Sequence, residues 1–223
     1  MNFLKNTILN KKAILWDFDG CLCDSEQVHY LAYAKAFLQC QHNLNEYEYY
    51  DTFTHTGGGV VKEIENYNLT CDPDAIRKEK AKFYWELILN EKAQFYPEIP
   101  KILNIVKKNN IINAIASNSP AKEIELIISQ YTAERLPIDM VIGLEPGMRK
   151  KPSPDLYLKA LKDLKISPTE ALVVEDSERG LLAAMEAGCE AIWIKTPLNE
   201  RFSTKAPYIS RITHAELLNI LSQ

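Results

Sequence analysis

Two aspartates separated by one residue directly follow an apolar run near the start of the chain. Ile-Leu-Trp at 14–16 leads into Asp17, Asp19 and Gly20. Such a run predicts a buried strand, and ligands of open α/β sheets bind outside the carboxyl ends of strands. Two close carboxylates repel each other unless a cation or a shared proton relieves them, and Mg²⁺ prefers oxygen ligands. We therefore expect a magnesium site, although an Asx-type turn at Asp19 would also fit.

A second predicted strand, at 112–117, ends in a hydroxyl residue. Ser117 would lie at the carboxyl end of this strand, where free backbone amides could receive a phosphate group. Two residues later, Ser119 is a candidate N-cap for a helix with Pro120 at its first position. From its residues alone, this segment fits a phosphate site or an ordinary strand-to-helix turn.

A lysine precedes a third predicted turn. Lys151 comes just before a predicted helix start, with Ser153 as the expected N-cap and Pro154 as the first helical residue. A positioned ammonium group can neutralise a phosphoryl group as a point charge. Together with Arg149 and Lys150, however, this lysine could equally form a solvated basic cluster.

Adjacent acids end a fourth segment. A β-branched run at 171–174 leads into Glu175 and Asp176, and an alanine-rich helix is expected to begin near Glu178. These carboxylates could complete the metal site that the two aspartates begin. Acids at a helix start also interact favourably with the helix dipole, so helix capping is the simpler alternative.

The order and spacing of the four segments resemble the haloacid dehalogenase superfamily of phosphotransferases over nearly the whole chain. The phrases at 96–98 and 183–188 are similar to the branch that contains β-phosphoglucomutase and phosphoglycolate-type phosphatases. The matched positions are Asp17, Asp19, Gly20, Asp24, Ser25, Ser117, Asn118, Lys151, Pro152, Pro154, Asp155, Glu175, Asp176, Ser177 and Gly180.

The resemblance implies roles for the two aspartates and a metal. Asp17 would attack phosphorus to give an aspartyl phosphate, and Asp19 would act as general acid and then as general base. Mg²⁺ would be held by Asp17, the backbone carbonyl of Asp19 and Asp176, with Glu175 close to the ion. Haloacid dehalogenases lack an acid at the position of Asp19, so the resemblance favours phosphate-ester chemistry over dehalogenation.

The resemblance also implies phosphate and substrate contacts. Ser117, Asn118 and Lys151 would hold the phosphoryl oxygens. In the inserted segment, His29 matches a hinge histidine of both mutases and phosphatases, although a lone helical histidine is often only a packed side chain. The loop Gly57, Gly58 and Gly59 falls where a substrate-reading loop is expected; the simpler interpretation is a flexible helix connection.

One cation of the inserted segment has two interpretations. Lys80 could match a mutase cap lysine, but its neighbours Lys78 and Lys82 favour a solvated helix face. The glycine loop lacks the phosphate-gripping arginine of the mutase, with Lys62 as its nearest cation. The sequence therefore favours hydrolysis over phosphoryl transfer within a sugar.

The elements that must position these residues form two parts. Strand-like runs alternate with helical stretches, which predicts a doubly wound parallel α/β sheet covered on both faces. Helical spacing at 28–38 and 75–89 predicts an inserted all-helical cap at 24–95, leaving 1–23 and 96–223 as the catalytic core. The expected core strands are 13–17, 112–117, 140–143, 172–175 and 191–195.

Composition narrows the partners. The chain has 223 residues, a formal net charge of −4 and no long basic block, so we expect no nucleic-acid or membrane partner. Five scattered cysteines do not suggest a disulfide scaffold, and the first ten residues are unlike a signal peptide, which favours a cytoplasmic protein. We expect a monomer or weak homodimer.

These observations lead to one function hypothesis and three alternatives. The chain is expected to be a Mg²⁺-dependent phosphatase of a small phosphorylated metabolite, either a sugar phosphate or an organic-acid phosphate. A sugar phosphomutase of the β-phosphoglucomutase type is the main alternative. A catalytically silent phosphate-binding module and a dehalogenase are weaker ones.

Overall fold

The computed structural model describes residues 2–55, 57–131 and 135–223. These residues form two compact units. The first, the core unit, consists of Met1–Asp24 and Phe95–Gln223; the second, the cap unit, is Ser25–Gln94.

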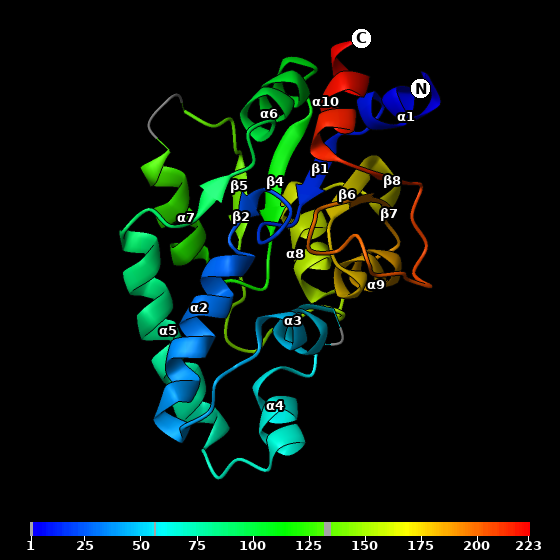
Figure 1. Cartoon of the computed structure of the whole chain (residues 1–223). Coiled ribbons are helices and arrows are strands. Elements are labelled where there is room, and N and C mark those ends of the chain that lie inside the picture. Colours follow the sequence, from blue (N-terminus) through cyan, green and yellow to red (C-terminus); the bar gives the residue numbers. More distant parts are fainter. Residues whose placement is uncertain (1, 56, 132–134) are drawn as a thin grey trace. The chain divides into compact units, whose positions relative to one another are not determined.

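The core unit contains a six-stranded sheet in which all neighbouring strands are parallel (Figure 1). The strand order β5-β4-β1-β6-β7-β8 has the first strand in the middle, as in doubly wound nucleotide-binding folds. The predicted fold class is therefore confirmed. The strands are β1 (Ala13–Trp16), β4 (Ile112–Ala116), β5 (Met140–Ile142), β6 (Ala171–Glu175), β7 (Glu190–Ile194) and β8 (Ser210–Ile212).

Helices connect these strands. The core helices are α1 (Asn2–Leu9), α6 (Ile99–Lys108), α7 (Ala121–Gln130), α8 (Asp155–Leu164), α9 (Glu178–Glu186) and α10 (His214–Ser222), with a 3₁₀ turn η3 (Pro168–Glu170). Helix α6 packs with α10, and α10 packs with α1; separately, α8 packs with α9. Strand β4 contacts both α6 and α8, and β6 contacts α9. Successive side chains of a strand point to opposite faces of the sheet.

The faces of β4 show this alternation. Ala114 and Ala116 pack into the apolar cluster that contains residues of α8 and α9. Asn113, the residue before Ala114, points the other way: its side-chain amide donates to the carbonyl of Leu103 in α6 at 3.0 Å. The sheet is therefore covered on both faces, and its interior strands are almost wholly buried.

The predicted N-cap residues of two helices are wrong. Ser119 and Ser153 do not cap α7 and α8; the residues at the cap positions are Pro120 and Pro154, which offer no side-chain hydrogen bond. The hydroxyl groups of Ser119 and Ser153 donate to carboxylates instead. The helix expected near Glu178 begins there, and its cap is Ser177, whose hydroxyl accepts from the amide of Gly180 at 3.1 Å.

The cap unit is mainly helical. Its elements are α2 (Glu26–Phe37), η1 (Leu38–Cys40), α3 (Glu46–Tyr49), the π-helical η2 (Tyr50–His55), α4 (Gly59–Tyr67) and α5 (Pro73–Leu89). Helices α2 and α5 pack against each other and lie side by side in Figure 1. Two short strands, β2 (Cys23–Asp24) and β3 (Gln94–Phe95), pair where the chain passes between the units.

The cap unit contains a disulfide, although the scattered cysteines of the sequence did not suggest a disulfide scaffold. Cys40 of η1 and Cys71, between α4 and α5, are bonded, with their Cα atoms 6.0 Å apart. The two cysteines are separated by 31 positions in no recognisable spacing, so only the fold brings them together. The other cysteines, Cys21, Cys23 and Cys189, are free and buried.

No helix among the described residues is both long and apolar enough to cross a membrane.

Replacing Asn113 by alanine tests a buried polar contact of the sheet. Its side chain accepts from the indole of Trp16 at 3.0 Å and donates to the carbonyls of Leu103 and Pro137 at 3.0 and 2.9 Å. Asn113→Ala would leave these buried groups unpaired and lower the free energy of unfolding by about 3 kcal/mol, measured by urea denaturation. The exposed Asn109→Ala is the control; an equal loss in both variants would contradict this account.

Candidate active site

The register of the sheet brings three strand ends together. Trp16 of β1 pairs with Ile115 of β4 and with Val174 of β6, so the next residue, Asp17, lies beside Glu175. The amide of Asp17 donates to the carbonyl of Val174 at 2.9 Å, continuing the ladder by one residue. Parallel pairing thus gathers residues that are far apart in the chain at one edge of the sheet, as predicted.

Lys151 lies at the centre of this edge. Its ammonium donates to Asp17 Oδ1 at 2.5 Å, to Glu175 Oε1 at 2.7 Å and to the carbonyl of Ala116 at 2.7 Å. The side chain is only 3% exposed, so the alternative of a solvated basic cluster is wrong for this lysine. Arg149, in contrast, is exposed and pairs with Asp155.

Burial and charge act in opposite directions here. Burial and the nearby charge of Glu175 raise the pKa of Asp17 well above its ordinary value, and Lys151 offsets part of this rise. For Lys151, burial alone would lower the pKa, but Asp17 and Glu175 raise it above its ordinary value. The lysine therefore stays protonated, and it favours the ionised form of the carboxylate that it touches.

Glu175 is completely buried and accepts hydrogen bonds on both oxygens. Oε1 accepts from Lys151 and from the hydroxyl of Tyr157 at 2.8 Å. Oε2 accepts from the amide of Asp176 and from the amide and hydroxyl of Ser177, at 3.0–3.2 Å. Helix capping is therefore not the role of Glu175: its carboxylate faces the lysine, and Ser177 caps the helix.

Asp19 lies among hydroxyl groups. Ser119 donates to Asp19 Oδ2 at 2.6 Å and Ser117 donates to the same oxygen at 3.3 Å. Ser117 in turn accepts from the amide of Ser119 at 3.0 Å. The sequence singled out Ser117 but gave Ser119 only a capping role; its position two residues after a predicted site residue was the available signal.

Asn118 and Arg179 fix the backbone of Lys151. The side-chain oxygen of Asn118 accepts from the Lys151 amide at 2.9 Å. The guanidinium of Arg179, in the first turn of α9, donates to the Lys151 carbonyl. Contacts with the amide and the carbonyl of Lys151 thus fix the backbone from which its ammonium group extends. The sequence did not predict the role of Arg179.

Asp176 approaches the turn that follows β1. Gly20 has a φ of +76°, and a Cβ built on it would lie 2.3 Å from Asp176 Oδ2. Only glycine accommodates both this backbone conformation and this close approach. The carbonyl of Asp176 accepts from the indole of Trp193 at 2.9 Å and from the side-chain amide of Asn199 at 2.8 Å.

The carboxylates suit a hard divalent cation. Asp17, Glu175 and Asp176 each offer an oxygen within 4.8 Å of the others. With Asp19 there are four acids and one ammonium at this edge, which leaves an excess of negative charge. Oxygen ligands and this charge excess are what Mg²⁺ prefers, so the residues fit the ion that the sequence predicts.

Cys21 is packed beneath the turn after β1. It is fully buried, and its thiol donates to the carbonyl of Val174 at 3.4 Å. Burial, followed by the nearby charge of Asp17, raises the pKa of the thiol. A buried thiol with a raised pKa is unreactive, which supports a packing role.

His29 and Lys80, two cap residues singled out from the sequence, lie together within the cap unit. His29 of α2 stacks on Tyr84 of α5 with ring centroids 4.1 Å apart. Lys80 Nζ lies 2.8 Å from His29 Nδ1 and 4.0 Å from the centroid of the Tyr84 ring. The interpretation of Lys80 as a solvated residue is therefore wrong: it is half-buried against an imidazole and an aromatic ring.

The glycine loop lies at the start of α4. Gly57 and Gly59 have φ values of +73° and +58°, and Gly58 is the N-cap residue. The preceding Thr56 lies outside the described residues. The glycines thus allow a tight entry into the helix, which accounts for their conformations.

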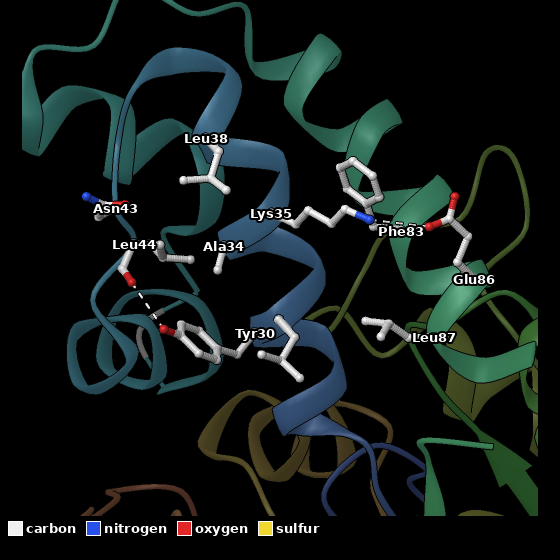
Figure 2. Close-up of a pocket in the computed structure, with 10 residues that line it drawn as sticks. Tyr30, Ala34, Lys35, Leu38, Asn43, Leu44, Phe83, Glu86 and Leu87 are labelled. Atoms are coloured by element: carbon white, nitrogen blue, oxygen red, sulfur yellow. Dashed lines mark hydrogen bonds and ion pairs between the residues drawn. The ribbon is translucent and has the colours of Figure 1, made fainter. Parts of the chain in front are cut away.

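The cap also has a pocket of about 540 Å³ between α2, α5 and residues 43–44 (Figure 2). Leu31, Leu38 and Leu87 are among its lining residues, and Lys35 pairs with Glu86 at 3.5 Å along its wall. None of the predicted site residues lines this pocket. All its lining residues belong to the cap unit.

The parallel sheet with this acid cluster defines an enzyme of the doubly wound α/β class with an inserted helical unit. The family model for haloacid dehalogenase-like hydrolases matches residues 14–194, and the chain belongs to this family. The predicted resemblance is thereby confirmed.

Individual relatives agree with this assignment. The chain is 30% identical over 197 residues to phosphoglycolate phosphatase from Aquifex aeolicus, covering 85% of this chain and 89% of the relative. It is 29% identical over 192 residues to protein CbbY from Rhodobacter capsulatus, covering 81% and 84% of the two chains. The crystal structure of CbbY from Rhodobacter sphaeroides in complex with phosphate is 25% identical and superposes with a TM-score of 0.81, covering 96% of this chain and all of that one.

Replacing Gly180 by alanine tests the placement of Glu175. A Cβ on Gly180 would lie 1.7 Å from Glu175 Oε1, so the carboxylate would have to move. Glycine-to-alanine changes in helices ordinarily stabilise by about 0.5–1 kcal/mol, but here we expect a loss of about 1–3 kcal/mol from overpacking. Catalytic turnover should fall roughly 10- to 100-fold, as for other residues that orient ligands.

The exposed Glu186→Ala, in the same helix, is the control and should change neither thermal unfolding nor turnover. A Gly180→Ala variant that is as stable and as active as the unchanged protein would show that the Glu175 carboxylate is not held at this position.

Proposed function

We propose that the chain is a Mg²⁺-dependent phosphatase that hydrolyses a small phosphomonoester through an aspartyl-phosphate intermediate. The observation that carries this proposal is the contact of the buried Lys151 ammonium with Asp17, at the sheet edge that also holds Asp176. A carboxylate beside a fixed positive charge and a metal-ligand set is suited to attack an anionic phosphoryl group.

In the first step, Asp17 Oδ attacks phosphorus and the bond to the leaving oxygen breaks. Asp19 protonates that oxygen as general acid, so an alcohol leaves. In the second step, Asp19 takes a proton from water, and the water attacks the phosphorus of the acyl phosphate, which releases inorganic phosphate and restores Asp17. The hydroxyl group of Ser119 would hold Asp19 while it exchanges these protons.

The remaining residues manage charge. Asp17, Asp176 and the carbonyl of Asp19 would hold Mg²⁺, and Glu175 would border the ion because both its oxygens accept protein hydrogen bonds. When bound, the ion offsets negative charge on the transferring phosphoryl group. On substrate binding, Lys151 would turn one of its three hydrogen bonds toward a phosphoryl oxygen, and Ser117 and Asn118 would bind the others.

The family and the relatives support the proposed substrate class. Phosphoglycolate phosphatase is named for a phosphorylated organic acid, and this chain covers most of its length. We therefore propose a phosphorylated organic acid or sugar as substrate, with His29 and the loop Gly57–Gly59 as predicted substrate-reading residues. A sugar phosphomutase remains the alternative, and product analysis separates the two.

A phosphate-release assay tests the proposed function. The protein is incubated with Mg²⁺ and a panel of organic-acid phosphates and sugar phosphates, including a hexose 1-phosphate, and free phosphate is measured. Asp17→Asn, which removes the nucleophile but keeps its size, should reduce release at least about 1,000-fold. Chelation of the divalent cation should abolish release, and adding Mg²⁺ should restore it.

Two results would contradict the proposal. Equal phosphate release by the unchanged protein and Asp17→Asn would exclude Asp17 as nucleophile. Conversion of the hexose 1-phosphate to its 6-phosphate without free phosphate would favour the mutase alternative.

A further inference from the structure

Tyr157 has a hydroxyl group that packing does not require. It lies in the first turn of α8, is completely buried and belongs to the apolar cluster beneath the sheet. Phenylalanine would fill the same space without a polar atom. Burying a hydroxyl group costs free energy unless it is hydrogen-bonded, so its partner is the informative feature.

The partner is a residue of the active site. The hydroxyl donates to Glu175 Oε1 at 2.8 Å, and this oxygen also accepts from Lys151 Nζ at 2.7 Å. The ring of Tyr157 faces the same ammonium, with Nζ 4.6 Å from its centroid. One side chain thus contacts both the lysine and the glutamate that the lysine bonds.

These contacts restrict how the carboxylate can turn. The other oxygen of Glu175 is held by the backbone and hydroxyl of the 176–177 turn. Without the tyrosine hydroxyl, Oε1 would keep only the lysine, and that lysine is shared with Asp17. Rotation of Glu175 would then draw the ammonium away from Asp17 or carry Asp176 with it.

We propose that Tyr157 is a positioning residue that holds Glu175, and through it Lys151 and Asp176, in the arrangement that binds Mg²⁺ and orients Asp17. This role rests on the proposed function for its catalytic consequence. The tyrosine acts through Glu175 and is not itself assigned to the reacting atoms. The ring supports the ammonium, and the hydroxyl fixes the carboxylate.

The variant Tyr157→Phe isolates the hydroxyl because it keeps the ring and its contact with Lys151. Mg²⁺ binding to the substrate-free protein is measured by titration calorimetry, and turnover is measured with p-nitrophenyl phosphate. Contacts behind metal ligands are worth roughly 10- to 100-fold in affinity or activity. We therefore expect the Mg²⁺ dissociation constant to rise, or kcat to fall, by at least about tenfold. KM should change less than kcat.

A matched control removes a hydroxyl of the same kind elsewhere. Tyr50 is also buried, and its hydroxyl donates to Gln27 Oε1 at the same distance of 2.8 Å. Tyr50→Phe should lower Tm by less than Tyr157→Phe, because its partner Gln27 is exposed and can bond water instead, and it should leave Mg²⁺ affinity unchanged. This comparison separates positioning from simple stabilisation.

Two outcomes would overturn the proposal. The first is a Tyr157→Phe variant with unchanged Mg²⁺ affinity and unchanged kcat, whatever its Tm. The second is a rise in KM alone, which would mean direct contact with the substrate. If the unchanged protein hydrolyses no phosphomonoester, the proposed function fails, whereas the Mg²⁺ titration still tests the positioning role.

Discussion

The ammonium group of Lys151 uses its three protons on three acceptors from three strand ends, and the core unit is organised around these contacts. Burying a carboxylate costs several kcal/mol per ion unless an opposite charge and hydrogen bonds compensate it. Asp17 and Glu175 are both buried, and the lysine bonds both. The ends of β1, β4 and β6 and the turn before α8 must therefore fold as one arrangement.

Stability alone does not explain such a cluster, because apolar residues of similar size often stabilise a protein at least as well as a buried ion pair. Chemistry explains it better. The parallel register gives Asp17 a fixed place, two glycines allow Asp176 and Glu175 to come close to the backbone, and Asn118 and Arg179 hold the lysine at its own peptide groups. The result is a rigid site with an excess of negative charge that a divalent cation would offset.

The sequence predicted most strands and the meeting of their polar ends, but it did not predict which partners the side chains contact. Buried apolar runs marked five of the six strands, β1, β4, β5, β6 and β7, and parallel topology then implied that their polar ends meet. The short β8, with serine and arginine in its three residues, had no such signal. Ser119 and Ser153 satisfied a local capping pattern, yet carboxylates compete for their hydroxyl groups in the folded chain. The Cys40–Cys71 bond and the contact of Lys80 with His29 join distant segments, which no local pattern predicts.

The account depends most directly on a covalent bond between phosphorus and Asp17. Rapid acid quenching during turnover, followed by borohydride reduction and peptide mass mapping, would convert an aspartyl phosphate into homoserine at its site. Homoserine should be found at position 17 in the unchanged protein with substrate and Mg²⁺, and not in Asp17→Asn. Homoserine at another aspartate, or its absence at position 17 under conditions in which phosphate is released, would contradict the account.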